Sequence, residues 1–139
     1  MNIQYSTKAI STGGRNGKVM VENSPLEFDM APPAEMGGTK PGVNPEQLFA
    51  AGYAACFGGA VQHALRVKKL PVAAPTIELT VGLGKNEADE NTLEVNIVAI
   101  FSGTDQETAD ALVQEGHQIC PYSRATRGNI NVTVSARVE

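Results

Sequence analysis

One long helix constrains the fold of this chain more than any other feature of its sequence. Asn44, Pro45 and Gln47 predict its start, with asparagine as N-cap, proline at the first helical position and glutamine three residues after the cap. The helix is predicted to continue to Lys69. Its first half is rich in alanine and glycine, so other backbone segments can approach several of its faces. We therefore expect it to be buried.

Strand patterns occur on both sides of this helix. Before it we predict three strands and a Gly/Pro-rich loop, at residues 2–10, 17–22, 26–30 and 31–43. After it we predict a strand pair with a charged turn, a second helix and a last strand, at residues 77–83, 93–101, 104–120 and 130–138. Elements in this order indicate an α+β fold.

Short local signals define the ends of several segments. Asn16-Gly17 is typical of a tight hairpin turn, which places Arg15 at or near the hairpin tip. Thr104 and Glu107 predict a capping box at the start of the second helix. Pro121 disfavours helical geometry in the residue before it, so that helix is predicted to end at Cys120.

Length and charge limit the possible functions. The chain has 139 residues, 42% of them hydrophobic, and a net charge of −4, which predicts a single domain over residues 1–139. Without a basic surface we expect neither nucleic-acid nor anionic-membrane binding. The N-terminus resembles no secretory signal, and no apolar run of about 18 residues could span a membrane, so a cytoplasmic location is expected.

The two cysteines are the candidate chemical groups. A cysteine acts as a nucleophile only as the thiolate, and Cys56 lies too far into its helix for the helix dipole to favour that form. A cation from elsewhere is needed, and Arg15 is a candidate. Cys120 is predicted at a helix C-terminus, which disfavours a thiolate and suits a resolving role.

From the residues alone, three interpretations of the cysteines stay open. They can form a redox-active dithiol, or they can be two unrelated buried cysteines. They can also bind a metal ion, because His117 and Cys120 have a spacing suited to two ligands on one helix, with Cys56 as a third. The metal interpretation lacks a fourth ligand. His63 is expected to be a surface or core-edge histidine.

Two longer segments and the hairpin turn resemble a known family. Gly42–Phe57, Cys120–Asn129 and Gly14–Gly17 are similar to the organic hydroperoxide resistance (Ohr) branch of the OsmC/Ohr family, and the match covers essentially the whole chain. The resemblance implies antiparallel sheets around a long buried central helix, in an intertwined homodimer with two active sites at the subunit interface.

The resemblance also implies an activity and its residues. Such a protein is a thiol-dependent peroxidase that reduces organic hydroperoxides, including those of fatty acids, and protects against oxidative stress. Cys56 would be the peroxidatic cysteine, Cys120 the resolving cysteine that forms a disulfide with it, Arg15 the thiolate-stabilising cation and Glu46 the carboxylate that holds Arg15. No cofactor or metal is implied, and the reductant would be an external dithiol such as dihydrolipoyl groups on a lipoylated protein.

Glu46 raises a geometric conflict within this set. It lies ten positions before Cys56, which is roughly 15 Å along a straight helix and on a different face. Either the helix breaks near Gly52, or a long side chain such as Arg15 spans part of the gap. Phe49 and Phe57 are expected as apolar walls for the substrate.

Two competing functions remain beside this prediction. The OsmC branch shares the fold and the cysteines but differs in substrate preference. A non-catalytic thiol sensor or metal-binding module is the alternative that His117 beside Cys120 suggests.

Overall fold

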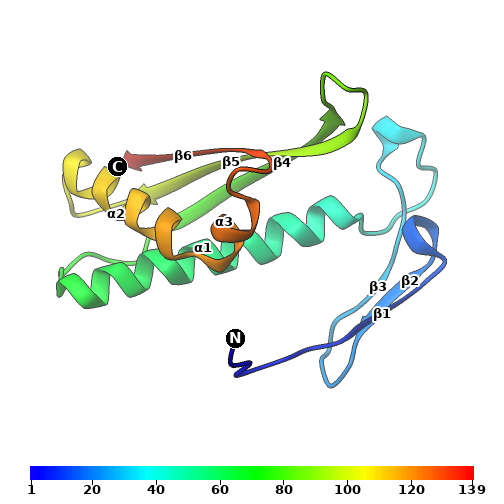
Figure 1. Cartoon of the computed structure of the whole chain (residues 1–139), viewed down its shortest axis with the longest axis horizontal. Coiled ribbons are helices and arrows are strands. Elements are labelled where there is room, and N and C mark those ends of the chain that lie inside the picture. The colour runs from blue at the N-terminus through cyan, green and yellow to red at the C-terminus, as the bar shows by residue number, and fades with distance from the viewer. The chain divides into compact units, whose positions relative to one another are not determined.

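The computed structural model describes residues 1–139, which form two compact units, Met1–Leu48 and Phe49–Glu139 (Figure 1). The fold is α+β, as predicted, with one sheet in each unit. The single domain over residues 1–139 that the chain length predicts stays a prediction, because a division into two compact units does not test it. No helix is long and apolar enough to cross a membrane.

The first unit contains an antiparallel sheet of three short strands. They are β1 (Ala9–Thr12), β2 (Lys18–Val21) and β3 (Glu27–Asp29), in the order β1-β2-β3. The strand predicted over residues 2–10 is wrong for most of its length. Because β2 has four residues, its ladder with β1 runs only from Thr12 back to Ala9, and the residues before Lys8 find no partner strand.

The turn between β1 and β2 is a 3-10 helix, Gly14–Asn16, which carries Arg15 at the hairpin tip as predicted. A side chain at Gly17 would place its Cβ 1.8 Å from the carbonyl oxygen of Thr12, so only glycine fits there. Lys40, from the loop after β3, donates a hydrogen bond to the Asn16 carbonyl at 3.1 Å. The close approach of the Gly17 backbone to Thr12 and the hydrogen bond from Lys40 to Asn16 thereby hold the hairpin tip in place.

Helix α1 (Pro45–Lys68) starts and ends much as predicted. The Gln47 amide donates to Asn44 Oδ1 and the Asn44 amide donates to Gln47 Oε1, both at 2.9 Å, so the capping box is confirmed. At the other end Lys69 adopts a left-handed backbone conformation, φ 53°, which terminates the helix. The helix is continuous between these residues, so it does not break near Gly52.

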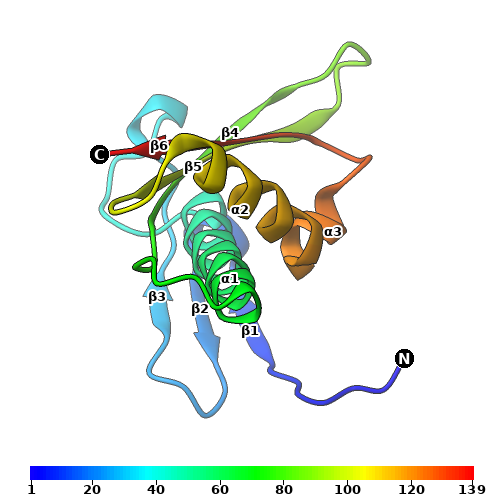
Figure 2. The ribbon, with the colours of Figure 1, turned by 90° about the vertical axis from the view of Figure 1, so that its left-hand side faces the viewer.

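The second unit packs helices against one face of a three-stranded sheet. Strands β4 (Thr76–Lys85), β5 (Asn91–Phe101) and β6 (Asn131–Val138) form the sheet, and α1 and α2 (Gln106–Ile119) lie on the same side of it (Figure 2). The strand pair β4–β5 is confirmed, with alternate side chains buried in β5 and half-buried along the first part of β4. The N-cap of α2 is Asp105, which accepts from the Thr108 amide, one residue later than predicted for Thr104.

The pairing of β5 with β6 is parallel, so the second sheet is mixed, whereas only antiparallel sheets were expected. Parallel neighbours need a crossover connection, and residues 102–130 supply it through α2 and a further helix, α3 (Pro121–Thr126). The sequence prediction ended at Cys120 and missed α3. Pro121 does terminate α2, but it also starts α3 at a position where proline is favoured.

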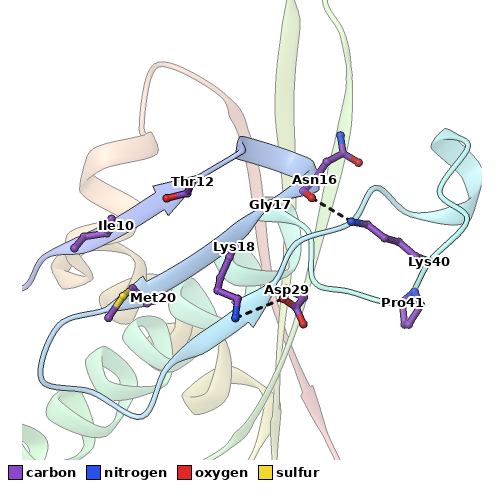
Figure 3. A pocket seen from close by; sticks show the side chains of 9 residues that line it. All are labelled: Ile10, Thr12, Asn16, Gly17, Lys18, Met20, Asp29, Lys40 and Pro41. Carbon is purple, nitrogen blue, oxygen red and sulfur yellow. Dashed lines mark hydrogen bonds and ion pairs between the residues drawn. The ribbon is translucent and has the colours of Figure 1, made fainter.

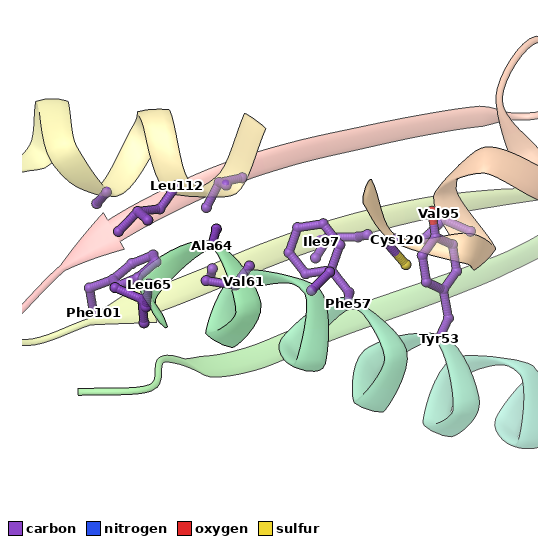
Figure 4. Packing of buried hydrophobic residues seen from close by; sticks show 14 residues of the cluster. Tyr53, Phe57, Val61, Ala64, Leu65, Val95, Ile97, Phe101, Leu112 and Cys120 are labelled. Carbon is purple, nitrogen blue, oxygen red and sulfur yellow. The ribbon is translucent and has the colours of Figure 1, made fainter. Parts of the chain in front are cut away.

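The core of the second unit lies between α1, α2 and β5 (Figure 4). Its largest fully buried side chains are Tyr53, Phe57, Phe101, Ile97 and Leu112. Along α1 the opposite face, with Ala51, Ala55 and Gly59, is exposed in the single chain. The long helix therefore buries one face against its own sheet and leaves a face of small residues free.

Candidate active site

The two cysteines meet although 64 residues separate them in the chain. Cys56 lies in the middle of α1, and Cys120 lies between α2 and α3, where it ends one helix and caps the next. Both are free thiols, and the Cys120 Sγ donates to the Cys56 Sγ at 3.5 Å. Cys120 is fully buried, whereas Cys56 is partly accessible. The accessible sulfur is therefore the one that an external molecule can reach.

Helix α3 is attached to α1 by buried hydroxyl groups. The Tyr53 hydroxyl lies 2.9 Å from Ser123 Oγ and 3.3 Å from Thr126 Oγ1. A buried phenol needs a polar partner, and here the partners come from the helix that Cys120 caps.

Aromatic rings surround the start of α3. Tyr122, 40% exposed, stacks on Phe49 at 6.3 Å between ring centroids and packs at 5.6 Å against Tyr53. The ring lies so close to α1 that a Cβ at Gly52 would be 3.2 Å from the Tyr122 hydroxyl. Of the two residues expected as apolar walls, Phe49 lies in this cluster, whereas Phe57 is fully buried in the core, and a wall role for Phe49 stays a prediction.

The surroundings of Cys56 keep it in the thiol form. Burial raises the pKa of the Cys56 thiol, a hydrogen bond from the Tyr122 backbone lowers it, and the nearby Cys120 raises it again, with a net increase. No cationic side chain contributes. A nucleophilic thiolate at this position therefore needs positive charge from another part of the molecule.

The second candidate pair, Arg15 and Glu46, is joined within the first unit. Arg15 donates Nη1 to Glu46 Oε2 at 2.9 Å and Nη2 to Glu46 Oε1 at 2.6 Å, a two-pronged ion pair. The hydrogen bonds from Arg15 lower the pKa of Glu46, and those to Glu46 raise the pKa of Arg15. At neutral pH both groups are charged.

Backbone hydrogen bonds place this pair. The Met30 amide donates to the Gly17 carbonyl at 2.8 Å, next to the hairpin tip. The Val43 amide then donates to the Asp29 carbonyl at 2.9 Å, which brings the residues just before α1 alongside the end of β3. Arg15 at the tip and Glu46 in the first turn of α1 are thereby neighbours, although 31 positions separate them.

The Arg15–Glu46 pair gives a pH prediction. Because the folded-state pKa of Glu46 is lowered, the pair stabilises the folded state above the unfolded pKa, about 4.3, and this contribution is lost as pH falls through the lower folded value. We expect the Glu46 carboxyl, followed by NMR, to titrate below the ordinary range and to return toward it in Arg15→Ala. An identical midpoint in both proteins would contradict the pairing.

His117 does not complete a metal site with the cysteines. No group of three or more His, Cys, Asp or Glu side chains is placed to hold a metal ion, so the set of His117, Cys120 and Cys56 is not brought together as ligands. Burial lowers the pKa of His117, and the positive charge of Arg127 lowers it further. His63 is exposed on α1, consistent with a surface histidine.

A hollow of about 710 Å³ lies on the sheet of the first unit (Figure 3). Ile10 and Met20 form part of its wall, with Lys18 and Asp29 paired at 3.9 Å on another side. It contains neither a cysteine nor Arg15 or Glu46. The two cysteines and the Arg15–Glu46 ion pair therefore do not line this hollow.

Sequence reasoning missed three residues of this region: Tyr53, Tyr122 and Ser123. Tyr53 and Tyr122 lie inside the segments that carried the family resemblance, but their contacts join residues about 70 positions apart. One local signal was available, since Cys120 and Ser123 are three positions apart, as are Tyr53 and Cys56. That spacing places each pair on one helix face.

One family model and several relatives of known name match nearly the whole chain or most of it. Residues 37–135 match the family model described as OsmC-like protein. The organic hydroperoxide resistance protein-like 1 of Staphylococcus saprophyticus is 45% identical over 140 residues, which cover 99% of both chains. The organic hydroperoxide resistance protein-like protein of Staphylococcus aureus is 44% identical over the same length.

Solved structures agree with these matches. A crystal structure of an organic hydroperoxide resistance protein from Elizabethkingia anophelis has a TM-score of 0.94 at 41% identity and covers 100% of both chains. The organic hydroperoxide resistance protein OhrB of Bacillus subtilis has a TM-score of 0.89 at 39% identity, covering 97% of this chain and 100% of its own.

Proposed function

Since the chain belongs to the organic hydroperoxide resistance branch of the OsmC-like family, we propose that it is a thiol-dependent peroxidase protecting against oxidative stress. Its substrates are organic hydroperoxides, including those of fatty acids, which it reduces to alcohols. The observation that carries this proposal is the 3.5 Å contact between the Cys56 and Cys120 sulfur atoms. Two free thiols at this distance can close a disulfide after a small movement.

In the proposed first step, the Cys56 thiolate attacks the distal oxygen of the hydroperoxide. A sulfur–oxygen bond forms and the oxygen–oxygen bond breaks, so Cys56 becomes a sulfenic acid and the alkoxide leaves as the alcohol after taking up a proton. Two electrons pass from sulfur to the peroxide. The partial accessibility of Cys56 and the apolar rings of Phe49 and Tyr122 support an approach by an apolar substrate.

Arg15 supplies the positive charge in this proposal, and Glu46 holds Arg15. The raised pKa of Cys56 in its own surroundings supports the need for such a cation. Helix α1 is continuous, so no helix break near Gly52 brings Glu46 to Cys56, and the proposal assigns the link to the long side chain of Arg15, which is paired with Glu46. Arg15 would favour the thiolate and stabilise negative charge on the peroxide oxygens.

In the second step, the Cys120 thiol attacks the sulfenic acid on Cys56. A disulfide forms, the sulfur–oxygen bond breaks, and the hydroxide leaves as water with the thiol proton of Cys120. An external dithiol then reduces the disulfide by exchange and is itself oxidised to a disulfide. The chain has no Cys-x-x-Cys or nucleotide-binding motif to supply electrons, which supports an outside reductant such as dihydrolipoyl groups on a lipoylated protein.

We also propose a cytoplasmic homodimer. Exposed apolar side chains in the first unit support a second chain packed against it: Ile10, Met20 and Leu26 are 42%, 43% and 48% exposed. The exposed face of small residues on α1, with Val67 at 63% exposure, supports close packing of helix against helix. A cytoplasmic location fits cysteines that work through cycles of oxidation and reduction.

The test of this function is a peroxidase assay with two substrates and two reductants. We expect tert-butyl hydroperoxide to be consumed at least about tenfold faster than hydrogen peroxide, because the apolar rings bind an alkyl group. Consumption should proceed with dihydrolipoamide and slow strongly with glutathione, a monothiol. A preference for hydrogen peroxide would contradict the proposed substrate class, and no consumption of either would contradict a peroxidase.

A further inference from the structure

Two pairs of side chains connect α1 to the segment that begins at Cys120. Cys56 meets Cys120 at 3.5 Å, and Tyr53 meets Ser123 at 2.9 Å. The second pair is displaced from the first by three positions in both segments. Tyr53 comes three positions before Cys56, and Ser123 comes three positions after Cys120. The hydroxyl contact therefore lies about one helical turn from the sulfur contact on both elements.

The hydroxyl groups form a chain whose direction follows from their hydrogens. Thr126 uses its single hydroxyl hydrogen toward the backbone, at 3.0 Å from the Tyr122 carbonyl and 3.2 Å from that of Ser123. Toward Tyr53 it must therefore accept. The Tyr53 hydroxyl then donates to Thr126 and accepts from Ser123, and every hydroxyl in the chain has a partner.

Because these hydrogen bonds are buried, they favour one placement of α3 against α1 over any other. Tyr53 and Ser123 are fully buried and Thr126 is 8% exposed. A shift of α3 by even part of a turn would leave hydroxyls without partners and without water, which is costly. The same shift would move Cys120, because it is the residue that caps α3.

We infer that Tyr53 and Ser123 are positioning residues for the resolving step, which rests on the function proposed above. Their hydrogen bond holds Cys120 against Cys56 so that the disulfide closes before a second peroxide reaches the sulfenic acid. Closing it requires the sulfurs to approach by about 1.5 Å, since a disulfide bond is about 2.05 Å long. Neither hydroxyl is hydrogen-bonded to a sulfur atom.

The chemistry that depends on this positioning is a competition. In the productive branch, the Cys120 thiol displaces hydroxide from the Cys56 sulfenic acid, which leaves as water with the thiol proton. In the other branch, a second hydroperoxide adds another oxygen to Cys56 and leaves as an alcohol, which gives a sulfinic acid. Weaker positioning of Cys120 slows the first branch only.

The experiment follows both steps in Tyr53→Phe, which retains the ring and removes the hydroxyl. Reduced protein is mixed with cumene hydroperoxide, quenched with acid at intervals and analysed by intact mass. We expect disulfide closure to slow at least about fivefold, the factor that loss of one buried hydrogen bond corresponds to, because the change removes the contacts with both Ser123 and Thr126. The rate at which hydroperoxide oxidises the Cys56 thiol should stay within about twofold of the wild-type rate. The yield of Cys56 sulfinic acid in the variant should increase with peroxide concentration.

Ser123→Ala provides the second variant, and Val61→Ala the control. Ser123→Ala should also slow closure, and the double variant should slow it little more than Tyr53→Phe alone, because both changes remove the hydrogen bond between Tyr53 and Ser123. Val61 lies in the same helix and core but far from the hydroxyls, so Val61→Ala should lower the melting temperature and leave closure unchanged. Equal slowing in Val61→Ala, or unchanged closure in both hydroxyl variants, would overturn the inference.

The wild-type protein separates this inference from the function on which it rests. If the wild type forms no disulfide, the proposed function and the inference both fail. If the wild type closes the disulfide and the two hydroxyl variants close it equally fast, the inference alone fails.

Discussion

Replacing Cys56 with serine is expected to abolish the dithiol-dependent consumption of alkyl hydroperoxides, with a loss of at least about a thousandfold. A serine hydroxyl does not ionise near neutral pH and cannot pass through a sulfenic acid, so the first step has no nucleophile. The replacement is nearly isosteric, and Cys56 is only partly buried, so the fold should persist. Peroxide loss is followed by a colorimetric assay alongside circular dichroism.

Cys120→Ser is the matched control for this experiment. It retains the attacking sulfur and removes the fully buried partner. One equivalent of hydroperoxide should still be consumed rapidly and give the Cys56 sulfenic acid, which excess hydroperoxide then converts to the sulfinic acid, so that turnover stops. If Cys56→Ser retained activity while Cys120→Ser lost its first turnover, the two roles would be reversed.

The second large effect is expected at Arg15. Arg15→Ala should lower the rate at which alkyl hydroperoxide oxidises Cys56 by about a hundredfold, the size expected when one charge-stabilising donor is removed. Burial raises the pKa of Cys56, and in the proposed role Arg15 lowers it, so loss of this cation should raise the pKa. The thiolate fraction at neutral pH falls as a result. Stopped-flow oxidation and the pH dependence of iodoacetamide alkylation measure the two effects.

Three variants sharpen the Arg15 experiment. Arg15→Lys retains the charge but loses the two-pronged geometry with Glu46, so its rate should lie between wild type and Arg15→Ala. Glu46→Gln should act in the same direction with a smaller loss. Lys8→Ala removes another cation of the first unit, which lies just before β1 and is paired with Glu22, and should change neither rate nor pKa. An unchanged alkylation profile in Arg15→Ala would contradict its proposed role.

Local signals predicted much of the fold. The start of α1 depends on contacts between Asn44 and Gln47, three positions apart, and the structure contains both hydrogen bonds. Strands β4 and β5 follow from alternation within each strand. In contrast, the parallel pairing of β6 with β5 depends on the path of residues 102–130, which no local pattern encodes.

The contacts of the candidate site also depend on distant parts of the chain, and local sequence signals did not predict them. The ion pair of Arg15 with Glu46 was expected only through the family resemblance, because it depends on the bridge between Met30 and Val43 that brings α1 beside β3. Helix α3 was missed because its six residues, which begin with Pro121, are too few for a periodic pattern. The contact between Tyr53 and Ser123, 70 positions apart, could not be predicted from either segment alone.

Disulfide formation between Cys56 and Cys120 is tested most directly by the mass of the protein after one equivalent of alkyl hydroperoxide. We expect each reduced chain to lose two hydrogen atoms and to yield a linked peptide containing Cys56 and Cys120 of the same chain. Consumption of the peroxide with both thiols still free, or with the added oxygen found on Cys120 instead of Cys56, would contradict it.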